Sequence, residues 1–267
     1  MAQTSRRQFT TSDGVTLSVL EAGGAHADAS VPAIALVTGW SMPASLWEKQ
    51  IQALAERRYV VALDPRGQGE SDVPRTGYTA ERRATDIRDF LEPLPRVVLV
   101  GWSLGALESL QYLEMFGADR VAGLVLVDSS VGEEPAPPPG GTFLQQLRDD
   151  RTRTLRNFAR AIFKTPRTDA EIDALVRGAS RMTVADSIAL LSYPFPRTHW
   201  RDIARGFTKP LLYVVTPQFE AQARNLRKHR PGTTIAVFKQ AGHALFVDEP
   251  SRFNRLIEAF VQTLPAR

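Results

Sequence analysis

A serine between two glycines is the strongest chemical signal in the sequence. The pentapeptide Gly-Trp-Ser-Leu-Gly occupies 101–105, directly after the apolar run 97–100 and directly before a helical pattern over 104–116. Glycines allow a very tight strand-to-helix turn, which lifts a serine hydroxyl off the carboxyl edge of a sheet and onto the positive end of the next helix. The pattern therefore predicts that Ser103 is a nucleophile.

A serine hydroxyl at neutral pH needs a base within hydrogen-bond reach, and histidine is the usual one. Of the four histidines, His26 and His229 lie in polar segments, and His199 lies in a helical region beside a tryptophan. His243 follows the last apolar run, 234–238, where a loop leaves the same sheet edge as Ser103. We therefore expect His243 to be the base, with His199 as a weaker candidate for contacting substrate.

Four segments together resemble the α/β-hydrolase superfamily, in its branch of serine esterases and cofactor-free haloperoxidases. They are Thr-Gly-Trp at 38–40, Asp-Pro-Arg-Gly-Gln-Gly-Glu-Ser at 64–71, the pentapeptide at 101–105 and Gly-His at 242–243. They occur in the family's order, and the resemblance runs from about Phe9 to the C-terminus. It implies an α/β fold with a mostly parallel eight-stranded sheet and a helical cap inserted after the sixth strand.

The resemblance also implies an oxyanion hole, built from two backbone N–H groups that stabilise the anion formed when serine attacks a carbonyl. These are the N–H groups of Leu104 and Trp40. Family members usually carry His-Gly before the second donor, whereas this chain has Thr38-Gly39. The bracing of that loop must therefore differ.

In the turn at 64–71 we expect a structural role, with two glycines shaping the turn and Asp64 and Arg66 bracing neighbouring loops.

The acid of the triad is less obvious, because the usual position after the strand at 211–215 holds no Asp: the residues there are Thr-Pro-Gln-Phe-Glu-Ala at 216–221. Some family members carry the acid after the preceding strand, where this chain has Asp128. We predict Asp128 as the acid and Glu220 as the alternative. Asp248 is expected to cap the last helix, and a Ser-His dyad without an acid is the remaining possibility.

The apolar runs alternate with amphipathic segments, as in a parallel sheet flanked by helices. Strands are expected at 16–21, 34–38, 60–64, 97–100, 123–127, 211–215 and 234–238, and helices at 44–56, 79–91, 104–116 and 251–264. A Pro- and Gly-rich stretch at 132–141 opens a mostly helical insertion. We therefore expect a core domain of 1–131 and 209–267, with a helical cap of 132–208.

Composition excludes several classes. The 267 residues contain no cysteine, so neither disulfides nor a cysteine nucleophile are possible. The net charge of +4 is dispersed, which does not favour nucleic-acid binding, and no run is long enough to span a membrane. Residues 5–9 resemble a twin-arginine export motif, but 10–14 are polar, so we expect a chance match. The expected location is cytoplasmic, or periplasmic or secreted if a signal peptide has been removed.

The predicted function is hydrolysis of small or medium carboxylic esters or lactones through an acyl-enzyme, without metal or other cofactor. A serine at 103 argues against the dehalogenases and epoxide hydrolases of the family, which use Asp there. Expected substrate contacts are Trp102, Gly39, Tyr193 and Trp200. Perhydrolysis with haloperoxidase activity or C–C bond hydrolysis is the alternative, and a non-catalytic ligand receptor is less favoured. The expected partner is a small-molecule substrate, in a monomer or homodimer.

Overall fold

A computed structural model describes residues 3–26, 31–137 and 141–265. Its centre is an eight-stranded sheet with the order β1-β2-β4-β3-β5-β6-β7-β8. The strands are β1 (Ser5–Thr10), β2 (Thr16–Ala22), β3 (Ala33–Val37), β4 (Val60–Asp64), β5 (Val97–Trp102), β6 (Val121–Val127), β7 (Leu211–Val215) and β8 (Thr233–Val237). β1 and β2 pair antiparallel with each other and β2 pairs antiparallel with β4, while every other pairing is parallel. This is the mostly parallel eight-stranded α/β sheet that the family resemblance implied.

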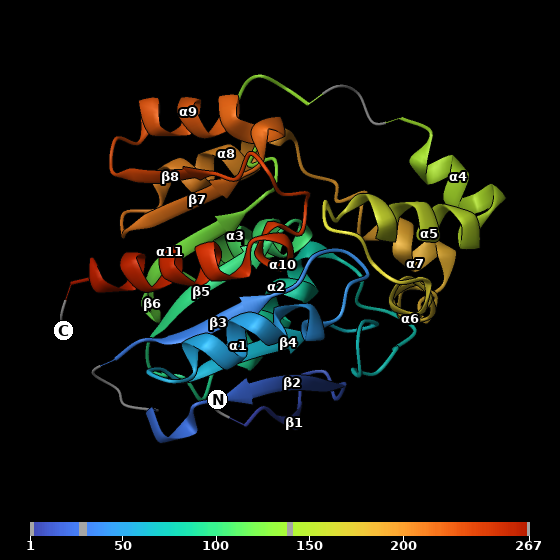
Figure 1. The fold of residues 1–267 in the computed structure, drawn as a ribbon, viewed down its shortest axis with the longest axis horizontal. Coiled ribbons are helices and arrows are strands. Elements are labelled where there is room, and N and C mark those ends of the chain that lie inside the picture. Colours follow the sequence, from blue (N-terminus) through green and yellow to red (C-terminus); the bar gives the residue numbers. More distant parts are fainter. Residues whose placement is uncertain (1–2, 27–30, 138–140, 266–267) are drawn as a thin grey trace.

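Helices cover both faces of the sheet (Figure 1). α1 (Glu48–Leu54), α10 (Leu245–Asp248) and α11 (Pro250–Gln262) contribute to the core on one face. α2 (Ala80–Leu91), α3 (Leu104–Phe116), α8 (Arg197–Gly206) and α9 (Glu220–His229) contribute to the core on the other. The described residues also form three short 3-10 turns: η1 (Gly24–His26), which is exposed, and η2 (Ala44–Trp47) and η3 (Pro217–Phe219), which contribute buried residues.

The central strands are apolar because both of their faces are covered, as parallel strands usually are. Every residue of β3, β4, β5, β6 and β7 is buried. Alternate residues of β3 separate into the two cores: Ile34 and Leu36 pack on one face, and Ala35 and Val37 on the other. The strands that approach the site are therefore fixed from both sides.

The expectation that the first strand starts at 16 was wrong. Ser5–Thr10 forms β1, an edge strand that pairs antiparallel with β2 in a register that places Phe9 opposite Leu17. Its residues alternate between exposed and half-buried, so its apolar pattern is weak. The segment that resembles an export motif is thus an edge strand in the structure.

The remaining helices form a separate group beyond one end of the sheet (Figure 1). They are α4 (Phe143–Asp149), α5 (Arg151–Ala161), α6 (Asp169–Ala179) and α7 (Val184–Ala189). α8 follows them in sequence but packs against α3 and α9 on the face of the sheet. We therefore propose that the cap consists of α4 to α7 and that α8 belongs to the core layer; the division at 132 and 208 stays a prediction.

The turn at 64–71 has the structural role expected from the sequence. Gly67 and Gly69 have φ angles of +79° and +51°, which favour glycine, and a Cβ on Gly69 would lie 1.9 Å from an Asp64 oxygen. The Asp64 carboxylate accepts a hydrogen bond of 2.6 Å from the backbone N–H of Ala44. Arg66 is fully buried and pairs with Asp86 at 2.6 Å. The turn therefore braces its neighbours.

The parallel strands bring five loops to one edge of the sheet. Residues 38–42 follow β3, Ser103 follows β5, Asp128 follows β6, Thr216 follows β7, and His243 lies in the loop after β8. Parallel strands end at the same edge, so residues far apart in the sequence meet there.

Among the helices of the described residues, none is long and apolar enough to cross a membrane.

Candidate active site

Ser103 lies on a strained turn between β5 and α3. Its φ and ψ angles are 56° and −120°, a conformation that is costly for a residue with a side chain. A Cβ on Gly101 would lie 2.4 Å from the carbonyl oxygen of Gly105, and one on Gly105 would lie 2.5 Å from that of Thr38. Only glycine fits at both places, so the two flanking glycines are what allow the serine to occupy this turn.

His243 and Asp128 are joined by a hydrogen bond of 2.8 Å between Nδ1 of the imidazole and Oδ2 of the carboxylate. The Asp128 side chain is 1% exposed and that of His243 26% exposed. The other carboxylate oxygen accepts from the backbone N–H of Thr216 at 2.6 Å. An ionised carboxylate only accepts hydrogen bonds, so Nδ1 carries the hydrogen and Nε2 of the neutral ring is free to accept a proton.

The backbone of the histidine loop is held by the last residue of β5. The indole N–H of Trp102 donates to the carbonyl oxygen of His243 at 2.9 Å, and the two rings lie 5.3 Å apart. Trp102 is 1% exposed and packs edge-on against Phe246 at 5.1 Å. Trp102, predicted as a substrate contact, thus lies against the histidine loop and is not among the residues that line the pocket beside Ser103.

Glu220, the alternative acid, lies in the first turn of α9 and pairs with Arg224 four residues later. The hydrogen bond from Arg224 and its positive charge lower the pKa of the Glu220 carboxyl below its usual range. Within the described part of the chain, the carboxylate that hydrogen-bonds to His243 is that of Asp128. The structure therefore brings Asp128 to the imidazole, whereas Glu220 is engaged on its own helix.

The loop after β3 touches both the serine and the cap. A Cβ on Gly39 would lie 3.0 Å from that of Ser103, so this glycine lets the loop approach the serine closely. The indole N–H of Trp40 donates to the carbonyl oxygen of Ser187 in α7 at 2.8 Å. The indole ring also packs edge-on against Phe158 of α5, with 5.2 Å between centroids. The side chain of Trp40 therefore belongs to the cap contact, while its backbone runs beside Ser103.

A pocket of about 230 Å³ opens beside Ser103. Its lining consists of Ser103, Leu104, Leu107, Ser129, Leu190, Leu191, Tyr193 and Trp200. Six of these side chains are apolar or aromatic, and within the described residues no charged side chain lines it. Tyr193 and Trp200, both predicted as substrate contacts, thus lie on the pocket wall. The environment suits an uncharged group of modest size.

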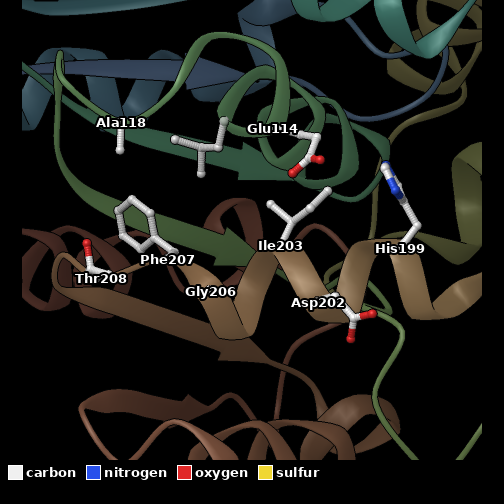
Figure 2. A pocket seen from close by; sticks show the side chains of 9 residues that line it. Glu114, Ala118, His199, Asp202, Ile203, Gly206, Phe207 and Thr208 are labelled. Atoms are coloured by element: carbon white, nitrogen blue, oxygen red, sulfur yellow. The ribbon is translucent and has the colours of Figure 1, made fainter.

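A second groove, of about 410 Å³, lies between α3 and α8 and shares no lining residue with the first. Figure 2 shows Glu114 of α3 facing Ile203 and His199 of α8; Phe207, which directly follows α8, also lines the groove. Nε2 of His199 is hydrogen-bonded to the side-chain oxygen of Gln111 at 2.8 Å. His199 therefore lines a different surface from Ser103.

No group of three or more His, Asp or Glu side chains in the described ranges is placed to hold a metal ion.

Asp248 has a different role from the one expected. α11 begins at Pro250, and its N-cap residue, Glu249, makes no side-chain capping bond. Instead the Asp248 carboxylate accepts hydrogen bonds from the backbone N–H groups of Lys164, Thr165 and Gly242, at 2.8, 3.0 and 2.8 Å. It thus ties the residue before His243 to the segment between α5 and α6. Lys164 and Thr165 are more than 80 residues away from Asp248, so no local pattern could have revealed this tie.

This carboxylate predicts a pH-dependent contribution to stability. Burial alone would raise the pKa of the Asp248 carboxyl, but its hydrogen bonds from the Thr165 hydroxyl and three backbone N–H groups together hold it below its usual range. A lowered pKa means that the stabilisation is complete above the unfolded value of about 4 and is lost as the pH falls through the folded value. Urea unfolding of Asp248→Ala should therefore show a loss of about 1–3 kcal/mol at pH 7 that shrinks towards pH 3.

The matched control is Asp149→Ala, which removes an exposed acid that accepts a hydrogen bond from Gln145 on the same helix. This control should differ little from the wild type at either pH. A deficit in Asp248→Ala that stays constant from pH 7 to pH 3 would contradict the stabilising role of the ionised carboxylate.

Comparison with known proteins shows the family of this chain. Residues 34–256 match the alpha/beta hydrolase family. A Synechocystis protein named as a non-heme chloroperoxidase is 35% identical over 262 residues, 86% of this chain and 91% of its own. A pimeloyl-[acyl-carrier protein] methyl ester esterase of Vibrio atlanticus is 25% identical, covering 89% and 97%. The structure of an Exiguobacterium antarcticum esterase superposes with a TM-score of 0.81 at 22% identity, covering 96% and 99%. This chain belongs to the alpha/beta hydrolase family.

Proposed function

We propose that this chain is a serine hydrolase that cleaves small, uncharged carboxylic esters, lactones included, through an acyl-enzyme. The observation that carries the proposal is the bond of 2.8 Å between His243 and the buried Asp128, in a loop beside the strained Ser103. An imidazole oriented in this way can accept the serine proton at Nε2. The esterase among the relatives supports the same reaction type.

In the proposed reaction, the Ser103 oxygen attacks the ester carbonyl carbon while His243 takes the hydroxyl proton. The N–H groups of Leu104 and Trp40 hold the oxyanion. Collapse of the tetrahedral intermediate expels the alcohol, which receives the proton from His243. Water then attacks the acyl-enzyme with His243 again acting as base, and the acid and free serine are released. Asp128 holds the imidazole and stabilises its positive charge in each half-reaction.

The apolar pocket supports a preference for uncharged acyl groups of a few carbons. Transfer of an ionised group into surroundings without a partner charge is costly, so a dicarboxylate half-ester should react poorly. The volume of about 230 Å³ is small for a ligand site. The proposed cap of α4 to α7, with Leu190 and Leu191 following it, would close one side of this pocket.

The test is labelling with a fluorophosphonate probe, followed by a panel of p-nitrophenyl esters from acetate to decanoate. The proposal expects one labelled site at Ser103 and the highest kcat/KM for short, uncharged acyl chains. Folded protein that neither reacts with the probe nor hydrolyses any ester of the panel would favour a ligand-binding role on a hydrolase fold and overturn the proposal.

Perhydrolysis is the second candidate, because the Synechocystis relative is named as a non-heme chloroperoxidase. In this reaction hydrogen peroxide replaces water in attacking the acyl-enzyme, and the peroxyacid formed oxidises halide outside the site. A halogenation assay with acetate, bromide and hydrogen peroxide distinguishes the two reactions. Bromination that outpaces ester hydrolysis under matched conditions would favour the second candidate.

The pocket predicts a change in acyl-chain preference for Leu107→Phe. Leu107 is half-buried in α3 and lines the pocket, so a larger ring there should occupy space needed by longer acyl chains. The ratio of kcat/KM for hexanoate to that for acetate should fall by about 10-fold, a typical effect of poor fit in an apolar pocket. Leu107→Met is the control, because it conserves volume. An unchanged ratio in Leu107→Phe would show that the acyl chain binds elsewhere.

A further inference from the structure

The side-chain amide of Gln68 is buried at 1% exposed and makes five hydrogen bonds. Its Nε2 donates to the carbonyl oxygens of Gly39 and Met42, both at 2.9 Å, and to the hydroxyl of Thr38 at 3.4 Å. Its Oε1 accepts from the backbone N–H of Ser41 at 3.1 Å and from Nη2 of Arg83 at 3.3 Å. Two carbonyl oxygens on one side and two N–H groups on the other fix which end of the amide carries oxygen. Gln68 therefore binds the backbone of the loop after β3 on both sides of Trp40.

The bond to Gly39 fixes a direction as well as a position. The carbonyl of Gly39 and the N–H of Trp40 belong to a single planar peptide unit, and in the trans form they point in opposite directions. A donor that holds the carbonyl from one side therefore orients the N–H towards the other. Hydrogen bonding to the carbonyl also polarises the same peptide unit, which makes its N–H a stronger donor.

The loop needs such a restraint because its backbone is strained. Ser41, directly after Trp40, has a φ of +58°, in the left-handed region that residues with side chains rarely adopt. Its side-chain oxygen is buried and has no partner among the described residues, so the hydroxyl does not hold the turn. The Ser41 N–H is bonded to Gln68 instead. The glutamine thus holds the backbone of a turn that the side chain of Ser41 does not stabilise.

Gln68 is itself held from behind by a buried ion pair. Nε of Arg83 lies 2.8 Å from a Glu108 oxygen, and both side chains are 1% exposed. A second nitrogen of Arg83 donates to the carbonyl oxygen of Arg66 at 2.9 Å. Glu108 also accepts from the hydroxyl of Tyr193 at 2.9 Å. A continuous set of hydrogen bonds therefore runs from the loop after β3, through Gln68 and Arg83, to a tyrosine on the pocket wall.

We propose that Gln68 is a positioning residue for the oxyanion hole, which aims and polarises the N–H of Trp40 through the Gly39 carbonyl. This inference rests on the proposed serine hydrolase function. Gln68 thereby braces the loop at Thr38-Gly39, where family members usually carry His-Gly.

The decisive variant is Gln68→Glu. The glutamate keeps the acceptor for Ser41 and Arg83. It replaces the two hydrogen bonds donated to the carbonyl oxygens of Gly39 and Met42 by repulsive contacts between a carboxylate oxygen and these oxygens. Loss of an oxyanion donor typically lowers kcat by about 100- to 1000-fold. Since this change only misaligns the donor, we expect kcat to fall by about 10- to 100-fold, with KM within about 3-fold of the wild type.

A transition-state analogue separates positioning from a general loss of structure. A trifluoromethyl ketone forms a tetrahedral adduct with Ser103 whose oxyanion occupies the hole, so its Ki should rise by the same factor as kcat/KM falls. Gln68→Met removes all five side-chain hydrogen bonds and should raise Ki and lower kcat/KM in the same way. The control is Gln222→Met, a buried glutamine that bonds to Ser130 and to the Pro135 carbonyl, and it should leave Ki within about 2-fold.

The inference is overturned if folded Gln68→Glu or Gln68→Met binds the ketone as tightly as the wild type, or if Gln222→Met loses affinity equally. If neither Gln68 variant folds, the test uses the NMR signal of the Trp40 backbone amide in the wild-type protein. Its NMR resonance should shift strongly on ketone binding, and an unshifted resonance would overturn the inference. A wild type without any ester hydrolysis or Ser103 labelling would instead refute the proposed function itself, and with it this inference.

Discussion

Replacement of Ser103 by alanine is expected to lower kcat/KM for p-nitrophenyl acetate by about 10⁴-fold or more, because no other group can form the acyl-enzyme. The residual rate should come from the oxyanion hole and from binding alone. The change removes one oxygen atom from a half-buried side chain, so urea unfolding should be nearly unchanged. The measurement is a steady-state rate with labelling by fluorophosphonate as the second readout.

The matched control is Ser109→Ala, six residues later and within α3. Ser109 is fully buried, and its hydroxyl donates to the carbonyl oxygen of Gly105 at 2.6 Å. It should cost some stability but leave labelling of Ser103 intact. If Ser103→Ala kept more than a small fraction of the activity, the nucleophile would have to be another residue.

The second large effect is expected for Asp128→Asn, with a fall in kcat of about 10³- to 10⁴-fold, as when the acid of a serine protease triad is replaced in this way. The geometry gives the reason. One oxygen of Asp128 accepts from the Thr216 N–H, so the asparagine oxygen should keep that bond. Its NH₂ group then faces Nδ1 of His243 and forces this nitrogen to accept. The ring proton moves to Nε2, which can no longer take the serine proton.

Glu220→Gln is the control for this prediction. Glu220 is partnered by Arg224 on α9, so its loss should change kcat by less than about 2-fold. Both variants should be compared on the same ester, with Ser103 labelling as a check that the site is intact. Near wild-type turnover in Asp128→Asn, together with a large loss in Glu220→Gln, would transfer the acid role to the glutamate.

Elements that bury a continuous apolar face could be predicted closely from the sequence. The expected segments at 60–64, 104–116 and 211–215 coincide with β4, α3 and β7. Thr79 was expected to start a helix and is the N-cap of α2, where its hydroxyl accepts from Arg82. β1 was missed because an edge strand buries only one face, so its apolar signal is half as strong. The position of α8 was not predictable either, since a helix carries no mark of which neighbour it packs against.

The residues of the candidate site also differ in how well they could be predicted from the sequence. Ser103 and His243 stand out locally, through flanking glycines and a position after a strand. Asp128 required the topology, because only the adjacency of β6 and β7 allows a carboxylate at the end of β6 to substitute for one after β7. Most contacts of Asp248 and Gln68 are made with backbone atoms, several of them in distant segments. Backbone partners leave no trace in the sequence, so these two residues could only be found in the structure.

The location of the Asp128 carboxylate affects how readily the loop after β7 can change over evolution. The segment after β7 contributes the backbone N–H of Thr216 to Asp128, and then continues through the short turn η3 into α9. Because the proposed acid, Asp128, directly follows β6, the side chains of 217–219 have no role in the proposed reaction. Natural variation or design could therefore lengthen this turn, or graft a binding loop into it, without disturbing the residues that the reaction depends on.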